Sequence, residues 1–142
     1  MVLVEASAWV LIQPDPLDPD AVCEPAGIQV ENTVLELRTN DCGWATFEQP
    51  SMADVAEGDT LDLFGWHSAL ASEEPDAEGV MWLELDGQRI WEVVVPIPAA
   101  EEVYIETWAS HHSADEGSGV RLHIHNHGGN TWNLASLERS RF

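Results

Sequence analysis

From residue 60 to the C-terminus, the sequence consists of short runs in which apolar and polar residues alternate, separated by turn residues. Because successive side chains of a β-strand point to opposite faces, this period of two predicts strands. No stretch of about 11 residues shows the 3.6-residue period of an amphipathic helix. Few folds are compatible with this pattern, and all of them are built from strands and turns.

The strongest local turn signal is Asp86-Gly87, since a type I′ hairpin needs two residues that tolerate a positive φ. Residues 68–78 and 111–119 are rich in Ser, Glu, Asp, Gly and Pro, which indicates longer loops. We expect strands over residues 30–38, 44–48, 60–67, 79–85, 89–96, 102–110, 120–126 and 131–139. The pattern predicts an all-β domain: a two-layer antiparallel β-sandwich, with a jelly roll as the expected arrangement.

The N-terminal part is organised differently. Residues 1–12 are apolar and alternate like a strand, so we expect an N-terminal strand rather than a signal peptide, for which a cationic start is missing. Residues 13–26 contain four prolines among aspartates, which predicts an extended connector. Residues 27–142 are then expected to form the sandwich, as one domain.

The chain has two cysteines, Cys23 and Cys42, which read either as one disulfide or as two unrelated thiols. Neither has a CxxC partner or a neighbouring His, so the spacing favours a disulfide over a metal site. A disulfide implies an oxidising compartment. We therefore expect an extracellular, periplasmic or cell-surface protein.

The charge balance limits the partners. The chain has 26 acidic residues, 5 arginines and no lysine, which gives a net charge of −21. This charge repels phosphate backbones and anionic lipids, so nucleic acid is not an expected partner. No apolar run approaches about 18 residues, so no membrane insertion is expected either. Acidic loops at residues 15–20 and 73–78 offer oxygen ligands for Ca²⁺, but neither has EF-hand spacing, and a solvated loop is the favoured interpretation.

Alternation divides the expected strands into two sets of side chains. The set expected in the core is Leu61, Leu63, Met81, Leu83, Leu85, Trp91, Val93, Val95, Val103, Ile105, Val120, Leu122 and Ile124. The opposite set is Asp62, Phe64, Trp66, Trp82, Glu84, Ile90, Glu92, Tyr104, Glu106, Trp108, Arg121, His123 and His125. The second set mixes aromatic rings with carboxylates and imidazoles.

Large aromatic rings on an outward face reduce solubility unless they are covered or used. Rings flanked by polar groups are suited to sugars, because the apolar side of a pyranose stacks on the ring while polar groups bind its hydroxyls. The predicted ligand-binding residues are Trp66, Trp82, Tyr104, Trp108, His123 and His125. The alternative is that the long loops or the N-terminal strand cover these rings.

The histidines permit a different hypothesis. His123, His125 and His127 alternate along one strand, so neighbouring imidazoles on one face could share Zn²⁺ or Cu²⁺, with His67 or the His111-His112 pair completing the site. A cupin-like metalloenzyme would add Glu84 or Glu106. A hydrogen-bonded ladder explains the same spacing, and we predict no resident cofactor.

Residues 126–132 form an Asn- and Gly-rich turn with an aromatic residue before a closing strand. With the preceding strand, this arrangement resembles jelly-roll carbohydrate-binding modules of bacterial secreted proteins. The resemblance is architectural, covers about residues 27–142 and carries over no binding positions.

These observations favour a secreted, non-catalytic binding module with a glycan as its ligand. The sequence contains no GxSxG, Walker, GxGxxG or HExxH motif. Two alternatives stay open. One is a structural subunit that forms homo-oligomers or docks a protein partner through the N-terminal strand and the aromatic face; the other is the metalloprotein.

Overall fold

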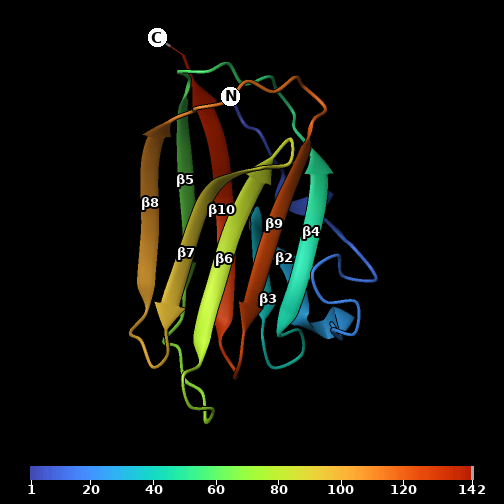
Figure 1. The fold of residues 1–142 in the computed structure, drawn as a ribbon, viewed down its shortest axis with the longest axis vertical. Coiled ribbons are helices and arrows are strands. Elements are labelled where there is room, and N and C mark those ends of the chain that lie inside the picture. Colours follow the sequence, from blue (N-terminus) through green and yellow to red (C-terminus); the bar gives the residue numbers. More distant parts are fainter. Residues whose placement is uncertain (142) are drawn as a thin grey trace.

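The computed structural model describes residues 1–141 and contains two β-sheets (Figure 1). Alternating apolar residues give each sheet one buried face, and these two faces pack together. We call the two sheets sheet A and sheet B. Sheet A has the order β2 (Ile28–Glu31), β3 (Val34–Arg38), β10 (Thr131–Ser140), β5 (Thr60–His67) and β8 (Glu102–Ala109). Sheet B has the order β1 (Val10–Leu11), β4 (Trp44–Pro50), β9 (Gly119–Asn126), β6 (Glu78–Leu85) and β7 (Gln88–Pro96).

All strand pairs are antiparallel, and from β3 onward the chain crosses between the sheets at every connection except the β6–β7 hairpin. This confirms the predicted all-β sandwich of the jelly-roll type. Two 3-10 turns, η1 (Ala6–Ala8) and η2 (Pro25–Gly27), are the helical elements of the described residues. None of the helices in this part of the chain has the length and apolar character required to cross a membrane.

The β6–β7 hairpin forms as predicted. Asp86 and Gly87 have φ values of 51° and 77°, which is the left-handed backbone that a type I′ turn requires. Beyond the turn, the register shifts by one residue between Leu83 and Glu84, which pair with Trp91 and Arg89. The extra residue on β7 is Ile90, and it packs partly against the core although simple alternation placed it outside.

The core lies between the inner faces of the two sheets. All the side chains predicted to be buried on β5, β6 and β9 are at most 2% exposed. They are Leu61, Leu63, Met81, Leu83, Leu85, Val120, Leu122 and Ile124. Phe47, Leu37 and Trp132 add further fully buried side chains from β4, β3 and β10.

The prediction for β8 was wrong. Val103 and Ile105 are 59% and 76% exposed, whereas Tyr104 is 5% exposed. The register pairs Tyr104 with Gly65 and Trp108 with Leu61, so these two rings lie on the inner side of the sheet. Because both alternation sets of β8 contain large apolar side chains, the period of two alone could not decide which set is buried.

The N-terminal segment does not form one continuous strand. Leu3 is fully buried, its amide donates to the carbonyl of Leu137, and its carbonyl accepts from the amide of Met52. η1 follows, and β1 then pairs with β4. The first residues therefore belong to the sandwich, and β1 forms one edge of sheet B.

Cys23 and Cys42 form the predicted disulfide, with their Cα atoms 4.1 Å apart. The Glu24 amide donates to the Asp41 carbonyl beside it, at 2.9 Å. The connector is thus fixed to the loop that leads into β4.

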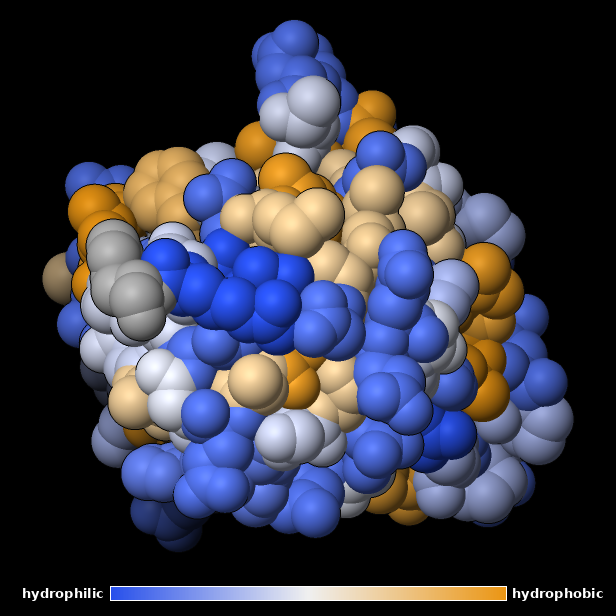
Figure 2. All heavy atoms as spheres, turned by 90° about the horizontal axis from the view of Figure 1, so that it is seen from above, coloured by the Kyte–Doolittle hydropathy of each residue, from blue (hydrophilic) through white to orange (hydrophobic). Residues whose placement is uncertain are grey.

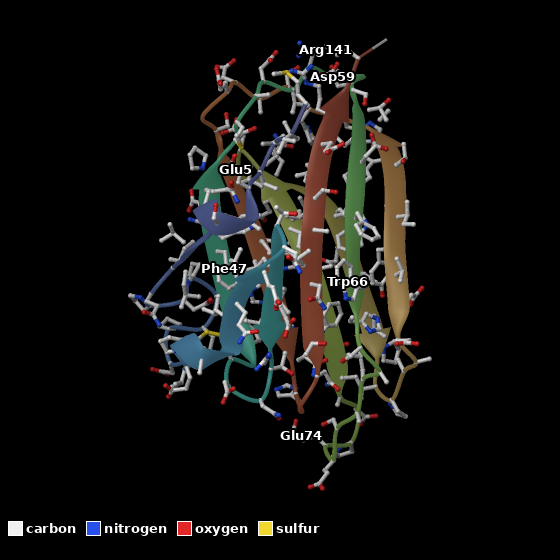
Figure 3. All side chains as sticks on the ribbon, turned by 180° about the vertical axis from the view of Figure 1, so that it is seen from behind. Glu5, Phe47, Asp59, Trp66, Glu74 and Arg141 are labelled. Carbon is white, nitrogen blue, oxygen red and sulfur yellow. A yellow bond between two sulfur atoms is a disulfide. The ribbon has the colours of Figure 1, made fainter. Side chains whose placement is uncertain are left out.

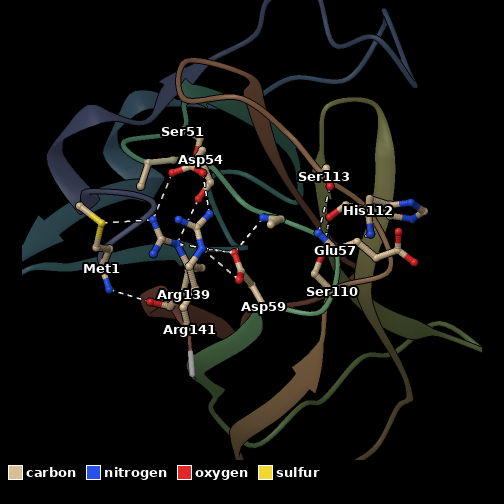
Figure 4. Close-up of polar contacts among 12 residues, drawn as sticks. Met1, Ser51, Asp54, Glu57, Asp59, Ser110, His112, Ser113, Arg139 and Arg141 are labelled. Carbon is tan, nitrogen blue, oxygen red and sulfur yellow. Dashed lines mark hydrogen bonds and ion pairs between the residues drawn. The ribbon is translucent and has the colours of Figure 1, made fainter.

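The end of the sandwich that carries both termini is closed by ion pairs (Figures 1 and 4). Arg139 Nη2 lies 3.2 Å from Asp54 Oδ1, and Arg141 Nε lies 3.0 Å from Asp59 Oδ2. The amino group of Met1 donates to the Arg139 carbonyl at 2.7 Å. Figure 2 shows a strongly hydrophilic band across this end.

Candidate functional site

The six predicted ligand-binding residues do not share one surface. Trp82, His123 and His125 lie on the outer face of sheet B. Trp66 lies on the outer face of sheet A, where it pairs with Val103 (Figure 3). Tyr104 and Trp108 are on the inner side of β8, so the structure separates them from the other four.

The outer face of sheet B, towards the viewer in Figure 1, carries aromatic and polar side chains from four neighbouring strands. Strand pairing arranges them in three rows across β4, β9, β6 and β7. The rows are Trp44, His125, Val80 and Val94; Thr46, His123, Trp82 and Glu92; and Glu48, Arg121, Glu84 and Arg89. Four residues separate the first and third rows, which corresponds to about 14 Å along the strands.

Four rings are packed against one another on this face. Trp44 and His125 are stacked, with ring centroids 4.3 Å apart and an interplanar angle of 11°. His123 and Trp82 are 5.1 Å apart. The Arg89 guanidinium lies 4.0 Å above the Trp82 ring and covers it, so Trp82 is 6% exposed. Trp44 and His125 are half-buried and are the more accessible rings of the cluster.

A chain of hydrogen bonds crosses the cluster. Thr46 Oγ1 lies 2.9 Å from His123 Nδ1, and His123 Nε2 lies 2.8 Å from His125 Nδ1. His123 is fully buried, and both of its ring nitrogens are used. The hydrogen-bonded ladder considered from the sequence is therefore the arrangement that the structure shows.

Asp15 from the connector closes one side of the cluster. Its Oδ1 accepts hydrogen bonds from the Trp44 indole at 3.0 Å and from the Leu17 and Asp18 amides at 2.9 and 3.1 Å. Burial raises the pKa of this carboxyl, but these donors and the Thr46 side chain outweigh burial and keep the pKa below its usual value. Asp15 is therefore a buried anion that fixes the orientation of the Trp44 ring.

Burial also determines the charge of the two histidines. Desolvation, together with the neighbouring His125, lowers the pKa of His123 to about 4. Desolvation likewise lowers the pKa of His125, against the opposing charge of Glu78. Both imidazoles are therefore neutral near pH 7.

This shift predicts a pH dependence of stability. An unfolded His has a pKa of about 6.5, so below that pH the unfolded chain binds a proton that folded His123 does not. The stability contributed by neutral His123 is complete above pH 6.5 and decreases as the pH falls towards 4. Between pH 7 and 5, we expect wild type to lose about 2 kcal/mol more than His123→Gln in urea unfolding. Equal losses in the two proteins would contradict the buried, neutral His123.

The arginines of this face are paired with carboxylates. Arg121 Nε lies 3.2 Å from Glu48 Oε2, and Arg89 contacts both Glu84 and Glu92. Glu48, Glu84 and Arg121 also line a depression of about 380 Å³ beside the β6–β7 turn. This end of the face supplies donors and acceptors of hydrogen bonds without a free cationic group.

Of the histidines in the metal hypothesis, only His123 and His125 come together among the described residues. His67 lies between the sheets, where its Nε2 is 3.0 Å from the Tyr104 hydroxyl, while His127 is exposed and 3.6 Å from Glu74. His111 and His112 lie in the loop between β8 and β9. Within residues 1–141, no group of three or more His, Cys, Asp or Glu side chains is arranged to hold a metal ion.

The outer face of sheet A carries a smaller apolar patch, formed by Phe64, Trp66, Val103 and Ile105. The Phe64 and Trp66 rings are 5.3 Å apart and tilted by 48°. Trp66 is labelled on this face in Figure 3. No buried hydrogen-bonding chain comparable to that of sheet B accompanies this patch in the described residues.

Sequence reasoning missed Trp44, Thr46, Arg89 and Asp15. The alternation of Trp44, Thr46 and Glu48 was visible, but β4 could not be placed next to β9 from the sequence. Asp15 reaches the site through the connector, and Arg89 reaches it through the bulge of β7. No pattern in the sequence predicts the contacts of Asp15 and Arg89 with this face.

Comparison with known proteins gives likeness in fold only. No protein-family model and no curated protein matches the chain. A solved structure described as "CBM4 structure and function" has a TM-score of 0.56 at 12% identity, covering 94% of this chain and 96% of that chain. The chain therefore has a β-sandwich fold similar to that of this structure. The expected architectural resemblance is thereby confirmed.

A second solved structure shows the same fold inside a larger protein. It is the enzymatically active domain of tailspike protein 4 of bacteriophage CBA120, with a TM-score of 0.50 and 13% identity. The match covers 95% of this chain but 19% of that chain. A fold similar to that of this chain thus occurs both as nearly a whole chain and as one part of a longer chain.

Proposed function

We propose that this protein is a non-catalytic glycan-binding module whose binding surface is the outer face of sheet B. The observation that carries the proposal is the half-buried Trp44 ring, part of which faces solvent and which is held from two sides. Its face stacks on His125 and its indole N–H donates to Asp15. A ring that is already fixed loses little conformational entropy when a pyranose stacks on it.

The surroundings of Trp44 fit a sugar. Glu92, Glu48 and Arg121 are exposed or partly exposed and lie within three rows of the same face, where they can bind hydroxyl groups. The apolar patch of sheet A offers rings with fewer polar neighbours, which suits a sugar less well. The disulfide supports an extracellular, periplasmic or cell-surface location.

The proposal is tested by affinity gel electrophoresis in soluble neutral polysaccharides: mixed-linkage β-glucan, xylan and β-1,4-galactan. We expect at least one of them to retard the wild-type protein. Trp44→Ala should weaken that binding by about 2 kcal/mol or more, roughly 30-fold, because a central Trp contributes strongly to an interface.

Trp66→Ala is the matched control, since it removes a half-buried Trp from the opposite face. It should bind like wild type. If Trp66→Ala loses the retardation while Trp44→Ala keeps it, binding lies on sheet A and the proposed surface is wrong. If neither neutral nor charged polysaccharides retard the protein, the proposal of glycan binding is wrong.

A further inference from the structure

The outer edge of sheet A is an unpaired strand. β8 pairs with β5 along its whole length without a register shift, and among residues 1–141 no other strand pairs with it. We propose that β8 is the interface of a symmetric dimer, in which the β8 strands of two copies of this chain pair antiparallel and join the two A sheets into one.

β8 differs from the other three edge strands of the sandwich. Natural edges are usually kept short, bulged or supplied with Pro or basic residues that prevent pairing. β1 has 2 residues and β2 has 4, while β7 contains the bulge at Ile90 and ends at Pro96. The eight residues of β8 contain no Pro, Lys or Arg and no bulge. In Figure 1, β8 is the outermost strand on its side, so a second chain can reach it.

The backbone groups that β8 offers to a second strand follow from its pairing with β5. The Ser110 amide donates to the Asp59 carbonyl at 2.7 Å, and the Ser110 carbonyl accepts from the loop that leads into β5. Because this direction alternates along a strand, the even-numbered residues of β8 face β5. The amides and carbonyls of Val103, Ile105 and Thr107 therefore point to the free edge.

The exposed side chains beside this edge are apolar. Val103 and Ile105 are both more than half exposed, and Phe64 on the neighbouring strand is 38% exposed. Pairing with a second copy brings Val103 and Ile105 of both chains side by side on one face, which removes apolar surface from water. The free backbone groups and the apolar side chains thus favour the same partner.

A two-fold axis through Ile105 uses all of these backbone groups. Ile105 then lies opposite Ile105 of the second chain, and Val103 lies opposite its Thr107. In each of these pairs, both residues direct their amide and carbonyl towards each other, so each pair can exchange both of its hydrogen bonds.

The glutamates of β8 favour the same axis, because like charges directly opposite each other destabilise a strand pair. With the axis at Ile105, Glu102 lies opposite Trp108 of the second chain and Glu106 lies opposite its Tyr104. An axis through Tyr104 would place Glu102 opposite Glu106, and an axis through Glu106 would place two copies of that residue opposite each other. Axes nearer to either end of β8 would pair fewer residues.

The charge of the chain makes this interface depend on salt. Each copy has a net charge of −21, so two copies repel each other at low ionic strength. The two Glu106 side chains add a local repulsion, since they occupy diagonal positions about 7–8 Å apart on the same face. At about 1 M salt the Debye length is about 3 Å, which screens both repulsions. We therefore expect monomers at low salt and dimers at high salt.

The dimer has a functional consequence, which rests on the proposed glycan-binding function. Because the axis is perpendicular to the joined sheet, both B sheets lie on the same side of it. Their outer faces point in the same direction, so one polysaccharide can contact both. The dimer itself is measured without a glycan, so dimer formation and glycan binding succeed or fail separately.

Sedimentation velocity of the ligand-free protein tests the dimer. We expect the dissociation constant to fall at least about 10-fold between about 0.05 M and about 1 M NaCl. Ile105→Lys places two ammonium groups opposite each other at the axis and should stay monomeric. Val10→Lys is the matched control, because it makes the same charge change at a 66% exposed valine of the edge strand β1. It should dimerise like wild type.

A wild-type monomer at both salt concentrations would overturn the proposal. Dimers that survive in Ile105→Lys would also overturn it, and if they are lost in Val10→Lys, association occurs through the N-terminal strand instead.

Disulfide cross-linking at high salt tests the register, since Cys23 and Cys42 are already bridged. Opposite Cα atoms in a hydrogen-bonded pair are about 5.5 Å apart, which a disulfide can span. Ile105→Cys should therefore form a covalent dimer under mild oxidation. The two copies of Thr107→Cys would lie about 14 Å apart and should stay unlinked. Equal cross-linking of both variants would contradict the axis at Ile105.

Discussion

Replacing Trp132 by Ala is expected to lower the free energy of unfolding by about 3–5 kcal/mol, the largest effect of any single substitution considered for this protein. The Trp132 side chain is fully buried, and its ring centroid lies 4.7 Å from that of His67. It also fills the space beside Gly79, where a Cβ atom would approach Trp132 Cζ2 to 2.6 Å. Removing the indole therefore leaves a cavity that neighbouring backbone cannot fill.

Urea unfolding followed by far-UV circular dichroism measures this effect. Trp66→Ala serves as the control, because its ring is half-buried on an outer face and its loss should cost about 1 kcal/mol. A loss for Trp132→Ala no larger than that of the control would mean that Trp132 is not the centre of the core.

Removing the disulfide is the second large change. The double variant Cys23→Ala, Cys42→Ala should be less stable by about 3 kcal/mol, as expected for opening a loop with a sequence separation of 19. The connector would also gain freedom next to β4, so Asp15 should hold the Trp44 indole less firmly.

Guanidinium unfolding with and without a reducing agent tests this prediction. Reduction should destabilise wild type to the level of the double variant and leave the double variant unchanged. Equal stability of wild type and the double variant would contradict a stabilising disulfide. If the NMR resonance of the Trp44 indole N–H is the same in both proteins, the other contacts of the connector are sufficient to hold it.

Much of the fold could be predicted because it depends on local patterns. The alternation of Leu61 and Leu63 decides which side of β5 is buried, since the opposite positions hold Asp62 and Thr60. Asp86-Gly87 determines a hairpin through backbone conformation alone. On β8, by contrast, only the pairing with β5 decides which side is buried.

The candidate site could be predicted in part. His123 and His125 were placed together because they lie on one strand, and alternation placed Trp82 on the same outer face, although Arg89 covers its ring and leaves it 6% exposed. Assigning Trp66 and Tyr104 to the same surface required knowledge of which strands belong to which sheet, and no local pattern contains it. The connection of Asp15 to Trp44 depends on a disulfide and a connector, which bring together residues distant in sequence.

The most direct test of the central claim is a titration of ¹⁵N-labelled protein with the polysaccharide that retards it, or with an oligosaccharide cut from it, following the indole N–H resonances of the seven tryptophans. We expect the Trp44 resonance to shift most, while those of Trp66 and the buried Trp132 stay nearly unchanged. A shift confined to Trp66 would contradict binding on the outer face of sheet B.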